Sequence, residues 1–220
     1  MNKSALHDIR TFLTPYNTTL IAVTKTHPVE VLQQAYSSGL RIFGENKVQE
    51  LISKAEVLPK DIQWHLIGHL QSNKVKYIAP FIYMIHSVDS FKLLQEINKE
   101  AKKNKRVIAC LLQVYIANED TKFGLDTQEL TNLLLHPELE QLENIQIQGL
   151  MGMATNTNDQ EQVRKEFRYL KNLFKSLAET IEKKNVAWKE ISMGMTSDYR
   201  LAVEEGSTMV RIGSAIFGNR

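Results

Sequence analysis

The sequence predicts an α/β protein, a single (β/α)8 barrel with an extra helix before the first strand. Two observations carry this prediction: short apolar runs alternate with segments of helical periodicity along the chain, and the apolar runs number eight. In addition, the 220 residues contain no linker rich in Pro, Gly or Ser and no shift in composition. We therefore expect residues 1–220 to form one domain.

Each strand candidate is short and mostly apolar on both faces, which is the pattern of parallel strands covered by helices. The candidates are residues 19–25, 41–46, 63–68, 83–88, 107–114, 145–151, 190–194 and 209–218. About six strands would suit a doubly wound sheet, whose first turn carries a glycine fingerprint. The corresponding turn here, VTKTHPVE, lacks that fingerprint, so the barrel is favoured.

Helical segments separate these runs. The first begins near Pro28, whose fixed φ suits a first helical turn, and stops at Gly39. Ser90 is expected to cap the helix that follows the fourth run. The longest segment, 159–185, has a single apolar stripe. The stripe consists of Val163, Phe167, Leu170, Phe174, Leu177 and Ile181.

The charge of the chain is nearly balanced. Lys and Arg number 27 against 25 Asp and Glu, a net charge of +2, so binding to nucleic acid is not expected. The basic run KKNKR at 102–106 is interpreted as a helix end, where cations complement the helix dipole.

The chain has the features of a cytoplasmic protein. Its only cysteine, Cys110, lies in an apolar run and is interpreted as a small buried residue, which fits a reducing compartment. No apolar stretch reaches the length of a membrane span, and the N-terminus lacks the apolar core of a signal peptide. We expect neither a membrane nor a secretory location.

A lysine stands at the end of the first strand candidate, and strand ends form the active-site face of such barrels. Lys25 follows an apolar run, so its amine is expected to be partly desolvated and close to a cation such as Arg211. Both effects lower the pKa of a lysine and make the amine a nucleophile toward carbonyl groups. The pattern predicts Schiff-base chemistry, with a substrate or with pyridoxal 5'-phosphate (PLP). The alternative is a lysine that only reaches water at a strand end.

The last strand candidate offers groups for a phosphorylated ligand. Gly213 and Ser214 present backbone N–H groups and a hydroxyl where such barrels commonly bind phosphate; a simple bend after the strand is the alternative. Arg211 lies two residues earlier, so its side chain shares a face with Gly213. An arginine beside a pyridine nitrogen keeps that nitrogen unprotonated and weakens PLP as an electron sink. A buried salt bridge is the competing interpretation of Arg211.

Other polar residues near strand ends have less specific interpretations. Asn46 is expected to cap the next helix, to contact a ligand, or both. His65 is expected inside the third strand, and His69 opens the next loop without a second metal ligand nearby in sequence. The sequence contains no His, Asp and Glu group with metal-ligand spacing, so no metal site is predicted.

Five stretches resemble the pyridoxal phosphate homeostasis protein family, which consists of stand-alone PLP-binding barrels related to the N-terminal domain of alanine racemase. They are AVTKTHP (22–28), FGENKVQE (43–50), WHLIGHLQSNK (64–74), LMGMA (150–154) and ISMGMTSDYRLAVEEGSTMVRIGSAIFG (191–218). The resemblance covers essentially the whole chain and implies a barrel of the alanine-racemase N-terminal-domain type. Lys122 and Gly124 also match the family pattern, whereas Phe123 departs from it.

The resemblance implies a residue-by-residue site. The lysine of the first motif would carry PLP as a Schiff base, the arginine of the last motif would face the pyridine nitrogen, and small residues would contact the phosphate. The residues implied to bind the cofactor are Lys25, Asn46, Ser192, Met193, Thr196, Arg211, Gly213 and Ser214.

The implied function is intracellular PLP (vitamin B6) and amino-acid homeostasis, with little or no catalytic turnover. Alanine racemase takes its second base, a tyrosine, from a separate β-domain, and we expect that domain to be absent because the chain ends at Arg220. Only Tyr199 is expected to approach the mouth. A PLP-dependent amino-acid racemase of low activity is the alternative, and a Schiff-base aldolase acting on a phosphosugar is a third. The expected partners are PLP and PLP-dependent apoenzymes, and we expect a monomer.

Overall fold

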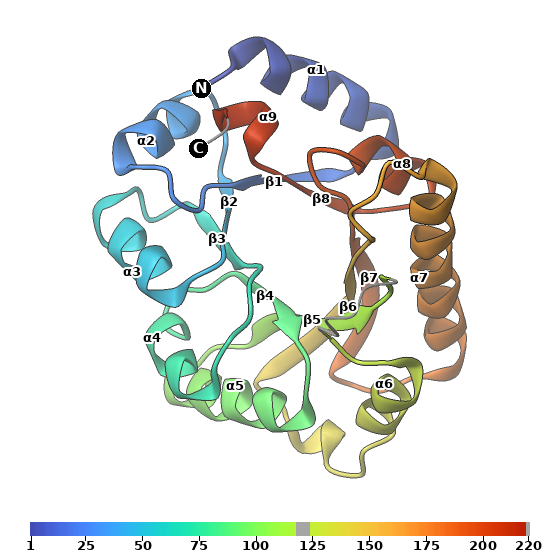
Figure 1. Ribbon diagram of the computed structural model, residues 1–220. Coiled ribbons are helices and arrows are strands. Elements are labelled where there is room, and N and C mark those ends of the chain that lie inside the picture. Colours follow the sequence, from blue (N-terminus) through green and yellow to red (C-terminus); the bar gives the residue numbers. More distant parts are fainter. Residues whose placement is uncertain (118–123, 219–220) are drawn as a thin grey trace.

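The computed structural model describes residues 1–117 and 124–218. In this part of the chain, eight parallel strands close into a barrel in sequence order, and the last pairs with the first. Figure 1 shows the strands as an inner ring and the helices as an outer one. The predicted fold class is confirmed.

The structure places a strand in every predicted run. The strands are β1 (Thr19–Val23), β2 (Ile42–Glu45), β3 (Gln63–Leu66), β4 (Met84–Val88), β5 (Ile108–Tyr115), β6 (Ile145–Met153), β7 (Val186–Ser192) and β8 (Met209–Ile212). The largest differences concern the last two. β7 begins four residues before its predicted start, and β8 ends at Ile212 because the apolar residues after Gly213 form the short helix α9 (Ser214–Phe217) instead.

The predicted N-terminal helix is α1 (Lys3–Leu13), and it lies beside α9 in Figure 1. The Asn2 N–H donates to the Ile216 carbonyl at 2.7 Å and so ties the start of α1 to α9. The helices of the outer ring are α2 (Val29–Ser37), α3 (Val48–Val57), α4 (Val75–Ile78), α5 (Phe91–Lys103), α6 (Thr127–Leu134), α7 (Gln160–Thr180) and α8 (Tyr199–Glu204). Short 3-10 turns lie at Thr14–Tyr16, Ser72–Lys74 and Leu139–Gln141.

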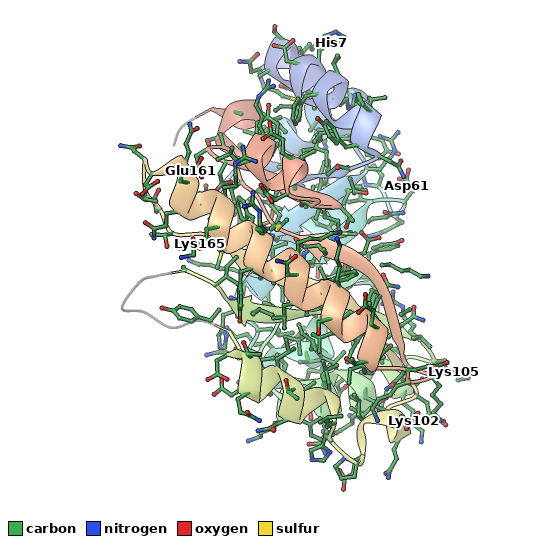
Figure 2. The ribbon with its side chains drawn as sticks, turned by 90° about the vertical axis from the view of Figure 1, so that its right-hand side faces the viewer. His7, Asp61, Lys102, Lys105, Glu161 and Lys165 are labelled. Atoms are coloured by element: carbon green, nitrogen blue, oxygen red, sulfur yellow. The ribbon has the colours of Figure 1, made fainter. Side chains whose placement is uncertain are left out.

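The helix signals read from the sequence have mixed outcomes. Ser90 caps α5 as predicted, because its hydroxyl accepts the Leu93 N–H at 3.3 Å. Helix α7 ends at Thr180, short of the predicted 185, so Ile181 of the stripe lies just beyond the helix. In Figure 2, Glu161 marks the side where α7 begins, and Lys102 and Lys105 of the basic run lie at the opposite end of the barrel.

Two apolar layers stabilise the barrel. The larger lies between strands and helices and contains alternate residues of the strands, such as Ala22 and Leu66, together with Met193 just after β7. The smaller lies inside the barrel and contains Ile21, Met84, Leu111, Met151 and Met209. The strand residues that alternate with the outward-pointing ones therefore point into the barrel. The side chains at the mouth of the barrel belong to this inward-pointing set.

Candidate cofactor-binding site

A cavity of about 580 Å³ opens where the strands end, and sites for small molecules typically measure roughly 300–1,000 Å³. Its walls come from the ends of β1, β2, β3, β6, β7 and β8 and from the loops that follow them. Of the residues expected to bind a cofactor, six line this cavity. They are Lys25, Asn46, Thr196, Arg211, Gly213 and Ser214.

The other two expected contacts, Ser192 and Met193, are fully buried and are not part of the cavity lining. The Met193 side chain points outward into the apolar layer between barrel and helices. Ser192 points inward, and its hydroxyl is bonded to two neighbours inside the barrel. The cavity wall near these two residues is formed by Met195, Thr196 and Ser197 of the loop after β7.

Lys25 reaches the cavity because of strand alternation. Val23, the last residue of β1, lines the cavity, and Lys25 lies two residues further on the same face. The lysine is half-buried, in the connection between β1 and α2. Its amine is therefore held at the mouth of the barrel, partly shielded from water.

Arg211 is buried and is bound by uncharged oxygen atoms in the described part of the chain. Its guanidinium donates to the Ser192 carbonyl at 2.8 Å, to the Ser192 hydroxyl at 2.7 Å and to the Gly152 carbonyl at 3.1 Å. Burial lowers the pKa of Arg211 to about 10, although nearby Asp198 acts in the opposite direction. These three bonds fix the guanidinium at the cavity wall, and they do not support the interpretation of Arg211 as half of a salt bridge.

A chain of hydrogen bonds continues from Arg211 across the barrel. Arg211 donates to the Ser192 hydroxyl, which lies 3.0 Å from His86 Nδ1, and His86 Nε2 lies 2.8 Å from His65 Nδ1. His65 Nε2 has no partner among the described residues. Burial lowers the pKa of His65 to about 3 and lowers that of His86 well below its usual value. Both imidazoles are therefore neutral supports for the arginine.

We expect these histidines to make the protein acid-sensitive. Below pH 6.5 an unfolded His65 takes up a proton, whereas the folded one stays neutral down to about pH 3. The unfolded state therefore binds more protons in this window, and the free energy of unfolding falls by up to about 1.4 kcal/mol per pH unit for each such histidine. Urea unfolding at pH 6.5, 5.5 and 4.5 measures the slope, which should be shallower in His65→Gln. The exposed control His7→Gln should keep the wild-type slope, and equal slopes in all three proteins would contradict the assignment.

The loop after β7 brings two hydroxyls to the cavity. Thr196 and Ser197 line it, and the loop is closed by the Asp198 carboxylate, which accepts the Met195 N–H at 2.6 Å. Gly194 has a φ of +94°, and a Cβ there would lie 2.5 Å from the Ala202 side chain. A glycine is thus required for α8 to approach this loop so closely.

Several sequence interpretations are corrected by the structure. Asn46 does not cap α3, since Lys47 occupies the N-cap position and no side chain caps that helix; Asn46 lines the cavity instead. Tyr199 does not approach the mouth, because its ring packs edge-on against Phe12 of α1, 5.6 Å away. His65 lies within β3 as predicted. Lys122 and Phe123 lie outside the described residues.

Residues that sequence reasoning missed also belong to the site. His27 lines the cavity, as do Ile67 and Ser197. His27 lies two residues after Lys25, and this spacing could have indicated that both side chains reach the cavity. His86, by contrast, is in the sequence a polar residue beside Ser87 in an otherwise apolar strand, and only the closure of the barrel brings it to Ser192.

The described residues contain neither a metal-binding cluster nor a helix that could span a membrane. No group of three or more His, Cys, Asp or Glu side chains in residues 1–117 and 124–218 could hold a metal ion. Over the same residues, every helix falls short of the length and apolar character that crossing a bilayer requires.

Comparison with known proteins places the chain in a family. The family model described as alanine racemase, N-terminal domain, matches residues 3–220. The pyridoxal phosphate homeostasis protein of Aquifex aeolicus is 42% identical over 202 residues, which cover 91% of this chain and 86% of that protein. A solved structure of PipY from Synechococcus elongatus with PLP bound is 36% identical, has a TM-score of 0.86, and matches 98% of this chain and 99% of its own.

A more distant likeness shows the fold alone. Alanine racemase of Clostridium difficile is 17% identical with a TM-score of 0.75, and the match covers 99% of this chain but 55% of the racemase. The chain thus corresponds to one part of that enzyme and to nearly the full length of the PipY structure. It belongs to the family built on the alanine racemase N-terminal domain and, within it, to the pyridoxal phosphate homeostasis proteins.

Proposed function

We propose that this protein binds PLP as a Schiff base on Lys25. The observation that carries the proposal is the meeting of three kinds of group in one cavity: the Lys25 amine, the Arg211 guanidinium, and the hydroxyls of Thr196, Ser197 and Ser214. An amine suits the aldehyde of PLP, hydroxyls and backbone N–H groups suit its phosphate, and a guanidinium suits the pyridine nitrogen. The PipY structure with PLP bound supports the same ligand.

In this proposal the eight cofactor residues form two groups, one at the cavity wall and one buried behind it. Lys25, Asn46, Thr196, Arg211, Gly213 and Ser214 contact PLP from the cavity wall. Ser192 acts from below by holding Arg211, and Met193 supports the strand end by packing outward. When bound, PLP supplies an electron sink, which an arginine at the ring nitrogen keeps weak.

We further propose a role in PLP and amino-acid homeostasis with little or no turnover. Relatives over most of the chain are named pyridoxal phosphate homeostasis proteins. Among the described residues that line the cavity, the titratable side chains are Lys25, His27 and Arg211, and a tyrosine is not among them. This set suits the capture and release of a cofactor better than two-base racemisation.

The remaining features of the proposal concern the whole molecule. We propose that residues 1–220 act as one PLP-binding domain, that the protein is a monomer in the cytoplasm, and that it passes PLP to PLP-dependent apoenzymes. Burial of the only cysteine, Cys110, raises the pKa of its thiol. With a single cysteine the chain cannot form an internal disulfide, which supports a reducing compartment.

Two measurements on the purified protein test this function. Titration with PLP should produce a saturable visible absorbance band at one PLP per chain, and a colourless saturated protein would refute the proposal. Incubation of the loaded protein with L-alanine in deuterium oxide should leave Cα unlabelled over many minutes. Exchange at the rates of an enzyme, typically 1–10³ per second, would favour the racemase instead.

A further inference from the structure

Three charged side chains, Glu45, Glu50 and Lys54, form a cluster beside the connection that carries Lys25. Glu45 ends β2, and the other two lie on α3. The Lys54 amine is buried and lies 2.7 Å from a carboxylate oxygen of Glu45 and 2.7 Å from one of Glu50. A lysine in a helix of a soluble barrel normally faces solvent, so this inward placement calls for a reason.

The cluster binds both neighbours of Lys25. Lys54 donates to the Thr24 carbonyl at 2.7 Å, and the Thr24 hydroxyl donates to Glu45 at 2.6 Å. On the other side of Lys25, the Thr26 N–H donates to Glu50. The backbone of Lys25 is thus fixed before and after the residue by one group of side chains.

Thr26 is held in a conformation that it would not adopt alone. Its φ is +68°, in the left-handed region, where a β-branched residue is an outlier. Such conformations persist only where the surrounding structure enforces them, and they concentrate at functional sites. The Thr26 side chain is exposed, so backbone groups hold this turn: the His27 N–H donates to the Thr24 carbonyl at 3.1 Å, and the Thr26 N–H donates to Glu50.

Stability of the fold is a poor explanation for the cluster. Glu45 is fully buried, and its second carboxylate oxygen has no partner among the described residues. Burial raises the pKa of Glu45 in spite of the bond from Lys54. Buried ion pairs often stabilise a protein less than apolar residues of the same volume would, so the position of the cluster next to Lys25 is the more informative fact.

We propose that Glu45, Glu50 and Lys54 are positioning residues that hold the β1–α2 connection in the strained turn that directs the Lys25 amine into the cavity. This role rests on the proposed function of Lys25 as the PLP-bearing residue. It assigns no contact with the cofactor to the cluster. The order of the turn is built into the protein before PLP arrives, so binding does not have to order the backbone of Lys25.

The test removes one side of this support. In Glu50→Ala we expect the PLP dissociation constant to rise roughly tenfold, since the turn must then be ordered on binding. The absorbance maximum and the melting temperature of the PLP-free protein should stay near the wild-type values. Glu50→Gln keeps an oxygen acceptor and should bind within about threefold of wild type. The control Glu56→Ala, an exposed residue on the same helix, should not change binding.

Two further measurements separate positioning from a general loss of structure. Asparagine tolerates the left-handed region, so Thr26→Asn in the Glu50→Ala background should recover most of the affinity. Without PLP, the amide of Thr26 should exchange with solvent faster in Glu50→Ala than in wild type or Glu56→Ala. Wild-type binding by Glu50→Ala, or a binding loss that follows a lower melting temperature and is not recovered by Thr26→Asn, would overturn the positioning role. A wild type that gives no PLP band would overturn the proposed function itself.

Discussion

Replacing Lys25 with alanine is expected to abolish the visible absorbance band that PLP gives on the protein, while the barrel stays folded. Lys25 lies at the cavity wall and is half-buried, so its removal deletes the covalent link without opening the apolar core. PLP should still bind weakly through the remaining wall residues and should be lost on gel filtration. Absorbance spectra before and after gel filtration measure both effects.

A matched control is available on the neighbouring strand end. Lys47 is exposed, is the N-cap residue just before α3, and is not part of the cavity lining. Lys47→Ala should keep the band and should retain PLP through gel filtration. A Lys25→Ala protein that keeps the band, or a Lys47→Ala protein that loses it, would show that the Schiff base forms elsewhere.

Replacing Arg211 with methionine is expected to weaken both the fold and PLP binding. The change leaves the Ser192 carbonyl and hydroxyl and the Gly152 carbonyl without their common donor. The Ser192 hydroxyl keeps its contact with His86, whereas each buried acceptor left unsatisfied costs about 1–3 kcal/mol. Relaxation offsets part of this cost, so we expect the free energy of unfolding to fall by about 2–4 kcal/mol. Loss of the charged group that we propose to face the pyridine nitrogen should raise the PLP dissociation constant at least about tenfold.

Urea unfolding without PLP and an absorbance titration with PLP measure the two effects of Arg211→Met separately. Arg211→Lys keeps the positive charge but replaces the planar guanidinium, with its several N–H donors, by one ammonium group. It should therefore recover binding only in part. Arg168, which is exposed on α7 and paired with Glu205, provides the control, and Arg168→Met should leave stability and binding nearly unchanged. Unaltered PLP binding by Arg211→Met would contradict its place at the pyridine nitrogen.

Much of the fold could be predicted because parallel strands covered by helices are apolar on both faces. Each of the eight runs was visible for this reason. Boundaries were less accessible: the run 209–218 is mostly apolar in both halves, and the sequence does not show that its second half forms α9. The start of α3 could not be placed from the sequence either. Asn is a residue type favoured at N-caps, but Lys47 and not Asn46 occupies that position.

The wall of the site was predictable for a different reason. Lys25, Arg211 and Gly213 follow from strand ends and from alternation along a strand, which are local rules. The side chains that support them come from distant parts of the chain. His65, His86 and Ser192 meet Arg211 only because four strands face one another inside a closed barrel. Nothing in the sequence distinguishes Lys54 from a surface lysine, and only the packing of α3 against β1 and β2 buries its amine.

The central claim is that PLP is attached to Lys25, and borohydride reduction followed by peptide mapping tests it most directly. Reduction of the PLP-saturated wild type converts the imine into a stable secondary amine, which mass spectrometry can locate. The account predicts one pyridoxyl group per chain, on the peptide that contains Lys25. A pyridoxyl group on another lysine, or none on a saturated protein, would contradict it.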